Sequence, residues 1–325
     1  MQTLSEFTLR SFIEKINSEG NSTGKIRREI RYDEPMADHT TFKVGGKADV
    51  WLRPEKEAFS DFAALLLDSA RKEGIPVFIL GAGANIVVSD KGIRGIVLDT
   101  GSYSGIEIIE KNGEQEFLVN ALSGTVVDSL VDDLAGQGLS GMEFLAGMPG
   151  SVGGTVWMNA RCFEKSVSDV LVETEILDET CKRKIIPFMT SDFSYKKSPF
   201  QGKENLILSA CFALQLREPK EIRKEADSHR RDRKEKGHYR FPSAGSVFKN
   251  NRDFRKPTGK IIDELGLRGL TVGGAQIAPW HGNIVINTGG ATAKDIKTLM
   301  DEVARRVKED RGLDLASEVL FAGDW

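Results

Sequence analysis

FLAGMPGSVGGTVWMNA, residues 144–160, is a glycine-rich stretch set between apolar segments. It overlaps the segment 136–154, which holds seven of the chain's 33 glycines. Glycine has no Cβ, so a glycine-rich backbone can bend sharply or approach another group closely. The spacing in this stretch allows the chain to wrap around a large planar or phosphate-bearing ligand.

The chain's first glycine-rich stretch, ILGAGANIVVSD at residues 79–90, lacks two features of a dinucleotide-binding fingerprint. Ile86 occupies the place of the third glycine, and IVVSD is typical of a strand, whereas the fingerprint continues as a helix. A Rossmann fold is therefore not expected. The backbone from Gly81 to Asn85 can cradle a pyrophosphate or form a plain tight turn. Together, the two stretches predict a bulky nucleotide cofactor.

Size and composition indicate an ordinary globular protein of two or three domains. The 325 residues exceed what one hydrophobic core normally supports. A net charge of -3 gives no reason to expect nucleic acid as the main partner. No apolar run approaches the roughly 18 residues that span a membrane, and the N-terminus lacks the apolar core of a signal peptide. We therefore expect a cytoplasmic protein without a membrane partner.

The cysteines and histidines give no sign of a metal site. The three cysteines are odd in number and widely spaced, which is typical of reduced thiols in the cytoplasm. The four histidines form no pair at ligand spacing. No metal is expected.

The order of helical and strand-like segments predicts an α+β protein in four ranges. The charged run PKEIRKEADSHRRDRKEKG, residues 219–237, is typical of a solvated linking helix. A final helix is expected to begin near Ala291 or Thr292 and to end before Gly312. The ranges are a helical extension at 1–30, two mixed parts at 31–98 and 99–213, and a last part at 214–325.

A third stretch, FPSAGSVFKN at residues 241–250, places Ser246 directly after a turn. Pro242 and Gly245 are typical of a turn, and Val247 and Phe248 predict the start of a buried strand. By itself, Ser246 is best interpreted as a turn serine that bonds its own backbone. A functional interpretation requires partners elsewhere in the chain.

Seven motifs occur in order from about residue 36 to 323. They are TTFKVGGKAD, LGAGANIVVSDKGIRGIVLD, GLSGMEFLAGMPGSVGGTVWMNA, FSYKKSPF, PSAGSVFKN, GLRGLTVGGAQI and SEVLFAG. Together these motifs resemble the UDP-N-acetylenolpyruvoylglucosamine reductase family, in its shorter second type. The resemblance implies a two-part FAD-binding region of the vanillyl-alcohol-oxidase (PCMH) type, at 31–98 and 99–213. It also implies a C-terminal α/β substrate-binding domain whose last residues, about 313–325, return toward the flavin.

The same resemblance implies non-covalent FAD, NADPH as electron donor and a UDP-sugar substrate whose enolpyruvyl group is reduced. It implies an enzyme of peptidoglycan precursor synthesis, which we expect to be a monomer. The expected cofactor-binding residues are Gly81, Ala82, Gly83, Ala84, Asn85, Gly147, Pro149, Gly150, Ser151, Gly153 and Gly154. The expected substrate-binding residues are Tyr195, Lys236, Asn250 and Gln276.

Three positions match the catalytic residues of the family. The serine of AGS, the proton donor, corresponds to Ser246, and the second acid of the C-terminal motif corresponds to Glu318. The basic residue after the motif tyrosine corresponds to Lys196. A cation stabilises charge that spreads into the substrate carboxylate, and Glu318 is expected to orient or assist the opposite side. A serine is a weak acid, so it must lie within hydrogen-bond reach of a strongly basic carbon.

Three positions depart from the family pattern. Lys196 stands where the family has arginine, so the charge is kept and the bidentate fork is lost. Arg161 stands where glycine is more common, and it can compensate for that loss or project outward. Lys236 precedes Gly-His, where the family has Gln-Pro.

Two other interpretations of the chain stay open on sequence grounds. A flavin oxidoreductase of the same fold could act on another substrate, since fold does not determine function. A non-catalytic nucleotide-sugar binder is compatible with the Lys196 departure. A nucleic-acid role for HRRDRKEK is disfavoured by the acids interspersed in the same helix.

Overall fold

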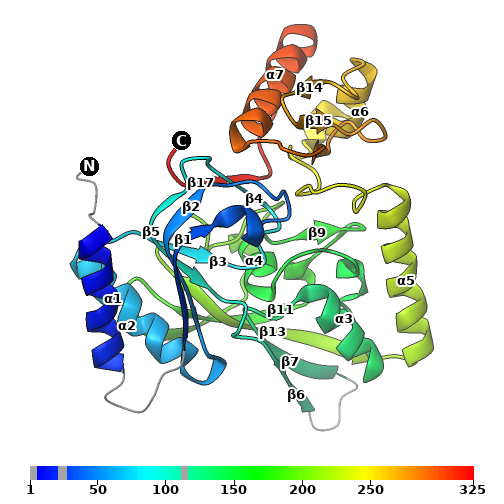
Figure 1. Cartoon of the computed structure of the whole chain (residues 1–325). Helices are drawn as coiled ribbons and strands as arrows, with labels where there is room; N and C mark the ends of the chain where they lie inside the picture. The colour runs from blue at the N-terminus through cyan, green and yellow to red at the C-terminus, as the bar shows by residue number, and fades with distance from the viewer. Residues whose placement is uncertain (1–5, 21–27, 111–115) are drawn as a thin grey trace. The chain divides into compact units, whose positions relative to one another are not determined.

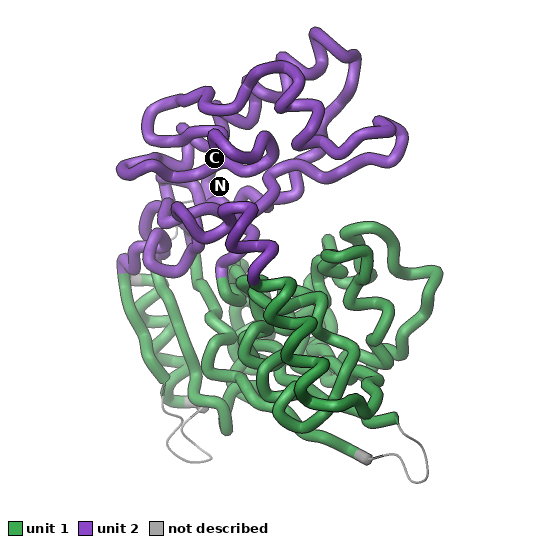
Figure 2. The backbone as a smooth tube through the Cα atoms, turned by 90° about the vertical axis from the view of Figure 1, so that its right-hand side faces the viewer, with its two compact units in different colours: residues 1–32, 50–82, 95–230 green, residues 33–49, 83–94, 231–325 purple. Residues whose placement is uncertain are grey.

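The computed structural model describes residues 6–20, 28–110 and 116–325, and they form two compact units. Unit 1 comprises residues 1–32, 50–82 and 95–230, and unit 2 comprises residues 33–49, 83–94 and 231–325, as coloured in Figure 2. Two short N-terminal segments therefore group with the C-terminal third of the chain. These units have other boundaries than the four ranges expected from the sequence, which remain a proposal.

A four-stranded sheet, in the order β1-β2-β5-β3, belongs mostly to unit 1, which also contains a six-stranded sheet. In the six-stranded sheet the order is β12-β11-β13-β7-β6, with β8 also paired to β13, and all these pairs are antiparallel. The strands of the first sheet are β1 (Arg28–Pro35), β2 (Lys47–Pro54), β3 (Val77–Leu80) and β5 (Ile93–Asp99). Those of the second are β6 (Ile106–Glu110), β7 (Glu116–Leu122), β8 (Leu139–Ser140), β11 (Leu171–Leu177), β12 (Arg183–Pro187) and β13 (Leu206–Leu216).

Two helices, α1 (Glu6–Gly20) and α2 (Phe59–Lys72), lie side by side and pack with strands of the four-stranded sheet in one apolar core (Figure 1). The buried residues of α2 recur every three or four positions, which puts them on one helical face. They include Phe59, Phe62, Ala63, Leu66 and Ala70.

The expected helix at 1–30 is shorter than predicted from the sequence. Its described part ends at Gly20, and Arg28 already begins β1. Residues 21–27 lie outside the described part of the chain. From Arg28 to Tyr32, half-buried and exposed side chains alternate, which is the period of a strand and not of a helix.

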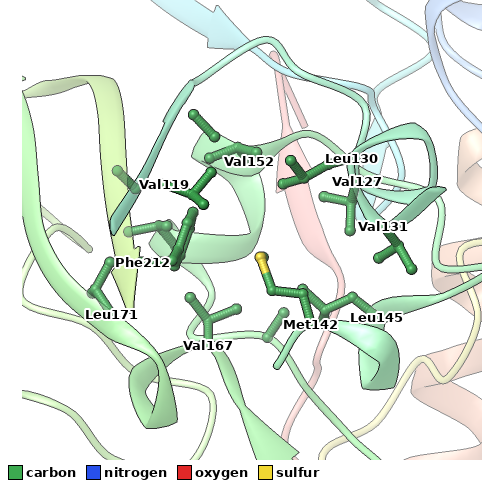
Figure 3. Close-up of a cluster of buried hydrophobic side chains, with 14 of the residues drawn as sticks. Val119, Val127, Leu130, Val131, Met142, Leu145, Val152, Val167, Leu171 and Phe212 are labelled. Carbon is green, nitrogen blue, oxygen red and sulfur yellow. The ribbon is translucent and has the colours of Figure 1, made fainter. Parts of the chain in front are cut away.

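A second core of unit 1 packs the six-stranded sheet against two helices, α3 (Val127–Gly136) and α4 (Val152–Trp157). Figure 3 shows apolar side chains from α3, α4 and the loop between them in one cluster with Phe212 of β13. This core includes Val127, Leu130, Val131, Met142, Leu145, Val152 and Phe212. Residues of the segment 144–160 belong to this core, so the core holds that segment in place.

Unit 1 also contains a small hairpin and most of a long helix. The hairpin joins β9 (Arg161–Cys162) to β10 (Lys165–Ser166). The charged run forms α5 (Pro219–Glu235), which confirms the expected linking helix. Only Ile222 and Ala226 are buried on α5, as expected for a solvated helix.

Unit 2 contains the antiparallel sheet β14-β15-β16 and the parallel pair of β4 and β17. Its strands are β4 (Ile86–Val88), β14 (Thr271–Val272), β15 (Ala275–Ile277), β16 (Val285–Asn287) and β17 (Leu320–Ala322). Its helices are α6 (Thr258–Glu264) and α7 (Ala293–Arg311). The apolar side of α7 and the residues Val247 and Phe248 belong to one core.

The limits of α7 match those expected from the sequence. Thr292 caps its N-terminus by accepting the Asp295 N–H, and Asp295 reciprocates in a capping box. Gly312 ends it with φ 71°, a left-handed conformation that glycine adopts without strain.

The expected strand at Val247 is wrong. Val247 and Phe248 are buried, but Ser246 and Phe248 form only isolated bridges, to Ile284 and Ser317. The backbone groups of residues 247–249 bond to two different segments, one at Asn283 and one at 316–318. This stretch therefore passes from one segment to the other and forms no continuous strand.

Candidate active site

In the first glycine-rich stretch, the chain leaves β3 and becomes β4 within a few residues. Ile86 is the first residue of β4, so a strand follows these glycines, as the sequence indicates. Gly83 has φ 62°, and a Cβ there would lie 1.9 Å from the His39 carbonyl oxygen. The Thr41 N–H donates to the Gly83 carbonyl oxygen at 3.1 Å. Only glycine is compatible with this close approach.

The second glycine-rich stretch, residues 144–160, turns tightly into α4. Gly147 has φ 69° and Gly150 has φ 158°. Ser151 caps α4 and accepts the Gly154 N–H at 3.4 Å. A Cβ on Gly81 would lie 2.5 Å from the Ser151 hydroxyl oxygen, so the two glycine-rich stretches touch at this point of unit 1.

Ser123 is a residue of this site that the sequence did not indicate. The Gly153 N–H donates to its carbonyl oxygen at 2.8 Å, and a Cβ on Gly153 would lie 2.9 Å from the Ser123 Cβ. The Ser123 hydroxyl is buried and has no hydrogen-bond partner among the described residues. Its one signal in the sequence is a Ser-Gly pair directly after a strand.

These features fit FAD. Close-packed glycines leave backbone uncovered by side chains, and a buried hydroxyl without a protein partner is suited to a polar ligand atom. The cofactor residues expected from the sequence fall into both units along the chain, with Gly81 and Ala82 in unit 1 and Gly83, Ala84 and Asn85 in unit 2. Pro149 lies on the second stretch, in unit 1.

The structure brings Ser246 and Glu318 together in unit 2. The Glu318 N–H donates to the Val247 carbonyl oxygen at 2.8 Å, and the Lys249 N–H donates to that of Ala316 at 2.8 Å. Ser246 and Glu318 therefore lie on adjacent, hydrogen-bonded backbone segments. Both residues are half-buried. Gly245 has φ 71°, with no other atom within 4 Å of the position of its absent Cβ. The space beside Ser246 is open there.

Asn85 and Asn283 hold these segments in place. The Asn85 side-chain amide donates to the Glu318 carbonyl oxygen at 3.0 Å, just before β17 pairs with β4. Asn283 is buried and uses its whole amide on Phe248, accepting the N–H at 3.0 Å and donating to the carbonyl oxygen at 2.8 Å. The sequence did not indicate Asn283, because its partner lies 35 residues away.

Tyr195 and Lys196 form the tip of a tight hairpin in unit 1. Ser194 and Lys197 exchange two backbone hydrogen bonds across it, at 3.2 and 3.0 Å. Lys196 has φ 56°, an uncommon conformation for a residue other than glycine. The Asn159 amide donates to the Ser194 carbonyl oxygen at 2.9 Å, so the hairpin is tied to the segment that follows α4.

Two further side chains, those of Gln201 and Ser198, tie the same hairpin to the end of α4. The Gln201 amide donates to the carbonyl oxygens of Trp157 at 2.8 Å and Lys196 at 3.2 Å. The Ser198 hydroxyl also donates to Trp157, at 2.7 Å. Strained backbone held this firmly is often found at functional sites.

Three other expected substrate residues have internal partners. Asn250 is exposed, and its side-chain oxygen accepts the Thr258 N–H at 2.9 Å, at the start of α6. The Gln276 amide donates to the Thr271 hydroxyl at 3.0 Å. Lys236 forms an exposed ion pair with Asp232 at 2.8 Å. These contacts give each residue a structural role and leave its substrate role a prediction.

Arg161 donates to the Ser166 hydroxyl at 3.1 Å across the small hairpin of β9 and β10. The guanidinium is half-buried. This contact does not assign Arg161 to the substrate, and it does not leave the side chain pointing freely into solvent.

His238 lies beside the expected substrate lysine and stays neutral near pH 7. Burial is the main cause that lowers the pKa of its imidazole to about 4, and the charge of Arg233 adds to this effect. Its ring lies 6.3 Å from that of His281, whose pKa is also lowered, mainly by burial. His238 therefore adds no positive charge beside Lys236 at neutral pH.

Two kinds of site are not found in the described residues. Across 6–20, 28–110 and 116–325, no group of histidines, cysteines and acids has the arrangement of a metal site. None of the described helices combines the length and apolar character needed to cross a bilayer.

Comparison with known proteins identifies both parts of the chain. Residues 60–183 match the model of an FAD binding domain. Residues 237–322 match the model of the UDP-N-acetylenolpyruvoylglucosamine reductase C-terminal domain. The reductase of that name from Treponema denticola is 42% identical over 308 residues, covering 91% of this chain and 94% of the relative. The one from Bacillus subtilis is 37% identical over 297 residues, with 91% and 94% covered.

The fold agrees with these matches. The crystal structure of UDP-N-acetylenolpyruvylglucosamine reductase from Thermus caldophilus has a TM-score of 0.73 and 30% identity, covering 91% of this chain and 99% of that one. The fold and the site define an FAD-dependent oxidoreductase, with a PCMH-type FAD-binding region and a C-terminal α/β domain. The chain belongs to the UDP-N-acetylenolpyruvoylglucosamine reductase family.

Unfolding the protein is expected to release all of its FAD. His39 is the histidine nearest in sequence to the first glycine-rich stretch, and histidines tether the flavin in some related proteins. Here its Nε2 is 2.8 Å from a Glu34 carboxylate oxygen, which engages the nitrogen in a hydrogen bond. Precipitation with acid followed by an absorption spectrum of the pellet tests this. Colour that stays with the chain would show a covalent bond.

Proposed function

We propose that the chain reduces UDP-N-acetylglucosamine enolpyruvate to UDP-N-acetylmuramate in peptidoglycan precursor synthesis. NADPH is the electron donor in this proposal. FAD, when bound, accepts electrons from NADPH and delivers a hydride to the enolpyruvyl double bond. The observation that carries the proposal is the pairing of Ser246 and Glu318 on adjacent backbone segments.

Ser246 is the proton donor in this proposal. The carbon next to the substrate carboxylate becomes basic when the neighbouring carbon gains hydride, and it needs a proton from a nearby acid. Two hydrogen bonds between Asn283 and the Phe248 backbone fix the chain directly after Ser246, and with it the backbone that carries the hydroxyl. Open space beside Gly245 leaves room for the substrate.

Lys196 and Glu318 act on the reacting group of the substrate, where negative charge develops. The Lys196 ammonium stabilises the negative charge that spreads into the substrate carboxylate, as the family's arginine does. Glu318 orients the opposite side of the reacting group. Tyr195, Lys236, Asn250 and Gln276 bind the rest of the UDP-sugar. The enzyme acts as a monomer in the cytoplasm.

NADPH oxidation that depends on the enolpyruvyl sugar nucleotide is the decisive test. We expect purified holoenzyme to consume NADPH only when this nucleotide is present, apart from slow oxidation by oxygen. UDP-N-acetylglucosamine, which lacks the enolpyruvyl group, is the matched control. Equal rates with both nucleotides would exclude the reductase activity and favour a flavin oxidoreductase with another substrate. Purification without a flavin spectrum would favour a plain nucleotide-sugar binder.

A further inference from the structure

One carboxylate oxygen of Asp128 joins the linking helix to the second glycine-rich stretch. It accepts the Gly147 N–H at 2.7 Å. The same oxygen accepts two bonds from the Arg230 guanidinium of α5, at 2.9 and 2.7 Å. These three residues all belong to unit 1 and come from segments up to 102 residues apart.

Gly147 is where the glycine-rich stretch 147–154 begins, and its φ of 69° turns the backbone sharply. A hydrogen bond from an N–H to a charged carboxylate is stronger than one to a neutral acceptor. Asp128 therefore determines the direction in which the Gly147 N–H points. A rotation at this residue displaces the backbone that follows it, up to Gly150, whose carbonyl oxygen accepts the Val127 N–H at 3.0 Å.

Arg230 keeps the Asp128 side chain in position. Burial alone would lower the pKa of the Arg230 guanidinium, but hydrogen bonds to Asp128 and Asp132 raise it above its ordinary value. Arg230 is therefore charged at any pH at which the protein is folded. It also donates to Asp132 at 2.7 Å, on the next turn of α3, and Asp132 gives no bond to Gly147.

We propose that Asp128, held by Arg230, is a positioning residue for FAD: it presents the backbone of residues 147–154 to the cofactor. The proposal rests on the proposed assignment of this stretch to FAD. Asp128 acts through Gly147 and does not itself touch the cofactor. It adds a contact from the linking helix to the set of residues on which FAD affinity depends.

Asp128→Asn tests the proposal, with Asp132→Asn as matched control. Both variants remove one negative charge that pairs with Arg230, but only the first weakens the acceptor of the Gly147 N–H. We expect the Kd for FAD, measured by quenching of flavin fluorescence on adding apoprotein, to rise at least about tenfold for Asp128→Asn. Asp132→Asn is expected to change the Kd by less than about twofold, because exposed ion pairs contribute little.

Unfolding of each apoprotein, followed by circular dichroism, separates positioning from general stability. A rise in Kd for Asp128→Asn with an apoprotein melting temperature like that of Asp132→Asn supports the proposal. An unchanged Kd overturns it, as does an equal rise in both variants. If Asp128→Asn does not fold, Arg230→Gln replaces it, since it leaves the carboxylate but removes its holder. An unchanged Kd in Arg230→Gln likewise overturns the proposal.

Gly153→Ala tests the underlying assignment separately. Its new Cβ would lie 2.9 Å from the Ser123 Cβ and would displace the stretch. Weaker FAD binding in Gly153→Ala with normal binding in Asp128→Asn would leave the assignment intact and refute the role of Asp128. Normal binding in both would refute the assignment as well.

Discussion

Replacing Ser246 with alanine is expected to slow the reduction of the enolpyruvyl nucleotide by about 10²–10⁴-fold, the usual contribution of a general acid. Proton delivery to the carbon next to the carboxylate then depends on water, which the turn at Ala244 and Gly245 does not position. Ser246→Cys is expected to keep part of the activity, because a thiol can still donate a proton.

The effect of Ser246→Ala should fall on one half-reaction only. Electron transfer from NADPH involves no proton from Ser246, so NADPH should bleach the flavin absorption at the rate seen with the unmodified enzyme. Stopped-flow measurement should then show that the bleached absorption persists after the nucleotide is added. If the colour returned at the unmodified rate, Ser246 would be a turn serine with no role in catalysis. A loss of the first step would instead indicate damage to FAD binding.

Replacing Lys196 with alanine is expected to lower kcat by about 10²–10³-fold, the usual effect of removing one group that stabilises transition-state charge. The ammonium is the charge that Lys196 offers in place of the family's guanidinium. Its hairpin is held by hydrogen bonds to the backbone of Ser194 and Lys196 from Asn159 and Gln201. The backbone of the variant should therefore stay in place, although alanine at φ 56° adds no relief of strain.

Lys196→Arg is the matched variant. It keeps the charge and restores the family's bidentate fork, so kcat is expected to stay within a few-fold of the unmodified enzyme. Steady-state kinetics with varied nucleotide distinguishes the roles. A rise in KM with kcat unchanged in Lys196→Ala would show that Lys196 binds the ground state and the transition state equally. Turnover close to that of the unmodified enzyme would remove Lys196 from the site.

The arrangement of the two cofactor stretches was only partly accessible from the sequence. The missing third glycine at Ile86 correctly excluded a dinucleotide fingerprint, because a strand and not a helix follows. That Gly81 would meet Ser151, and that Gly153 would meet Ser123, depends on segments folded against each other. Glycine content alone shows that something approaches closely, but not which group it is.

The sequence by itself determined the features that arise within one segment or from motifs in order. The start and end of α7 follow from Thr292 and Gly312, because caps act within one helical turn. The buried face of α2 follows from the period of its apolar residues. The seven motifs indicated the family, and with it the roles that we expect for Ser246 and Glu318.

Only the tertiary structure decided how distant segments pair. Local apolar character favoured a strand at Val247, but the backbone there is divided between Asn283 and the segment around Ala316. Asn85 reaches Glu318 across 233 residues, and Asp128 reaches Arg230 across 102. Hydrogen bonds of this kind depend on the packing of whole units. The residues next to a side chain in the sequence do not indicate which distant group it will bond. For this reason Ser123, Asn283 and Asp128 became visible only in the folded chain.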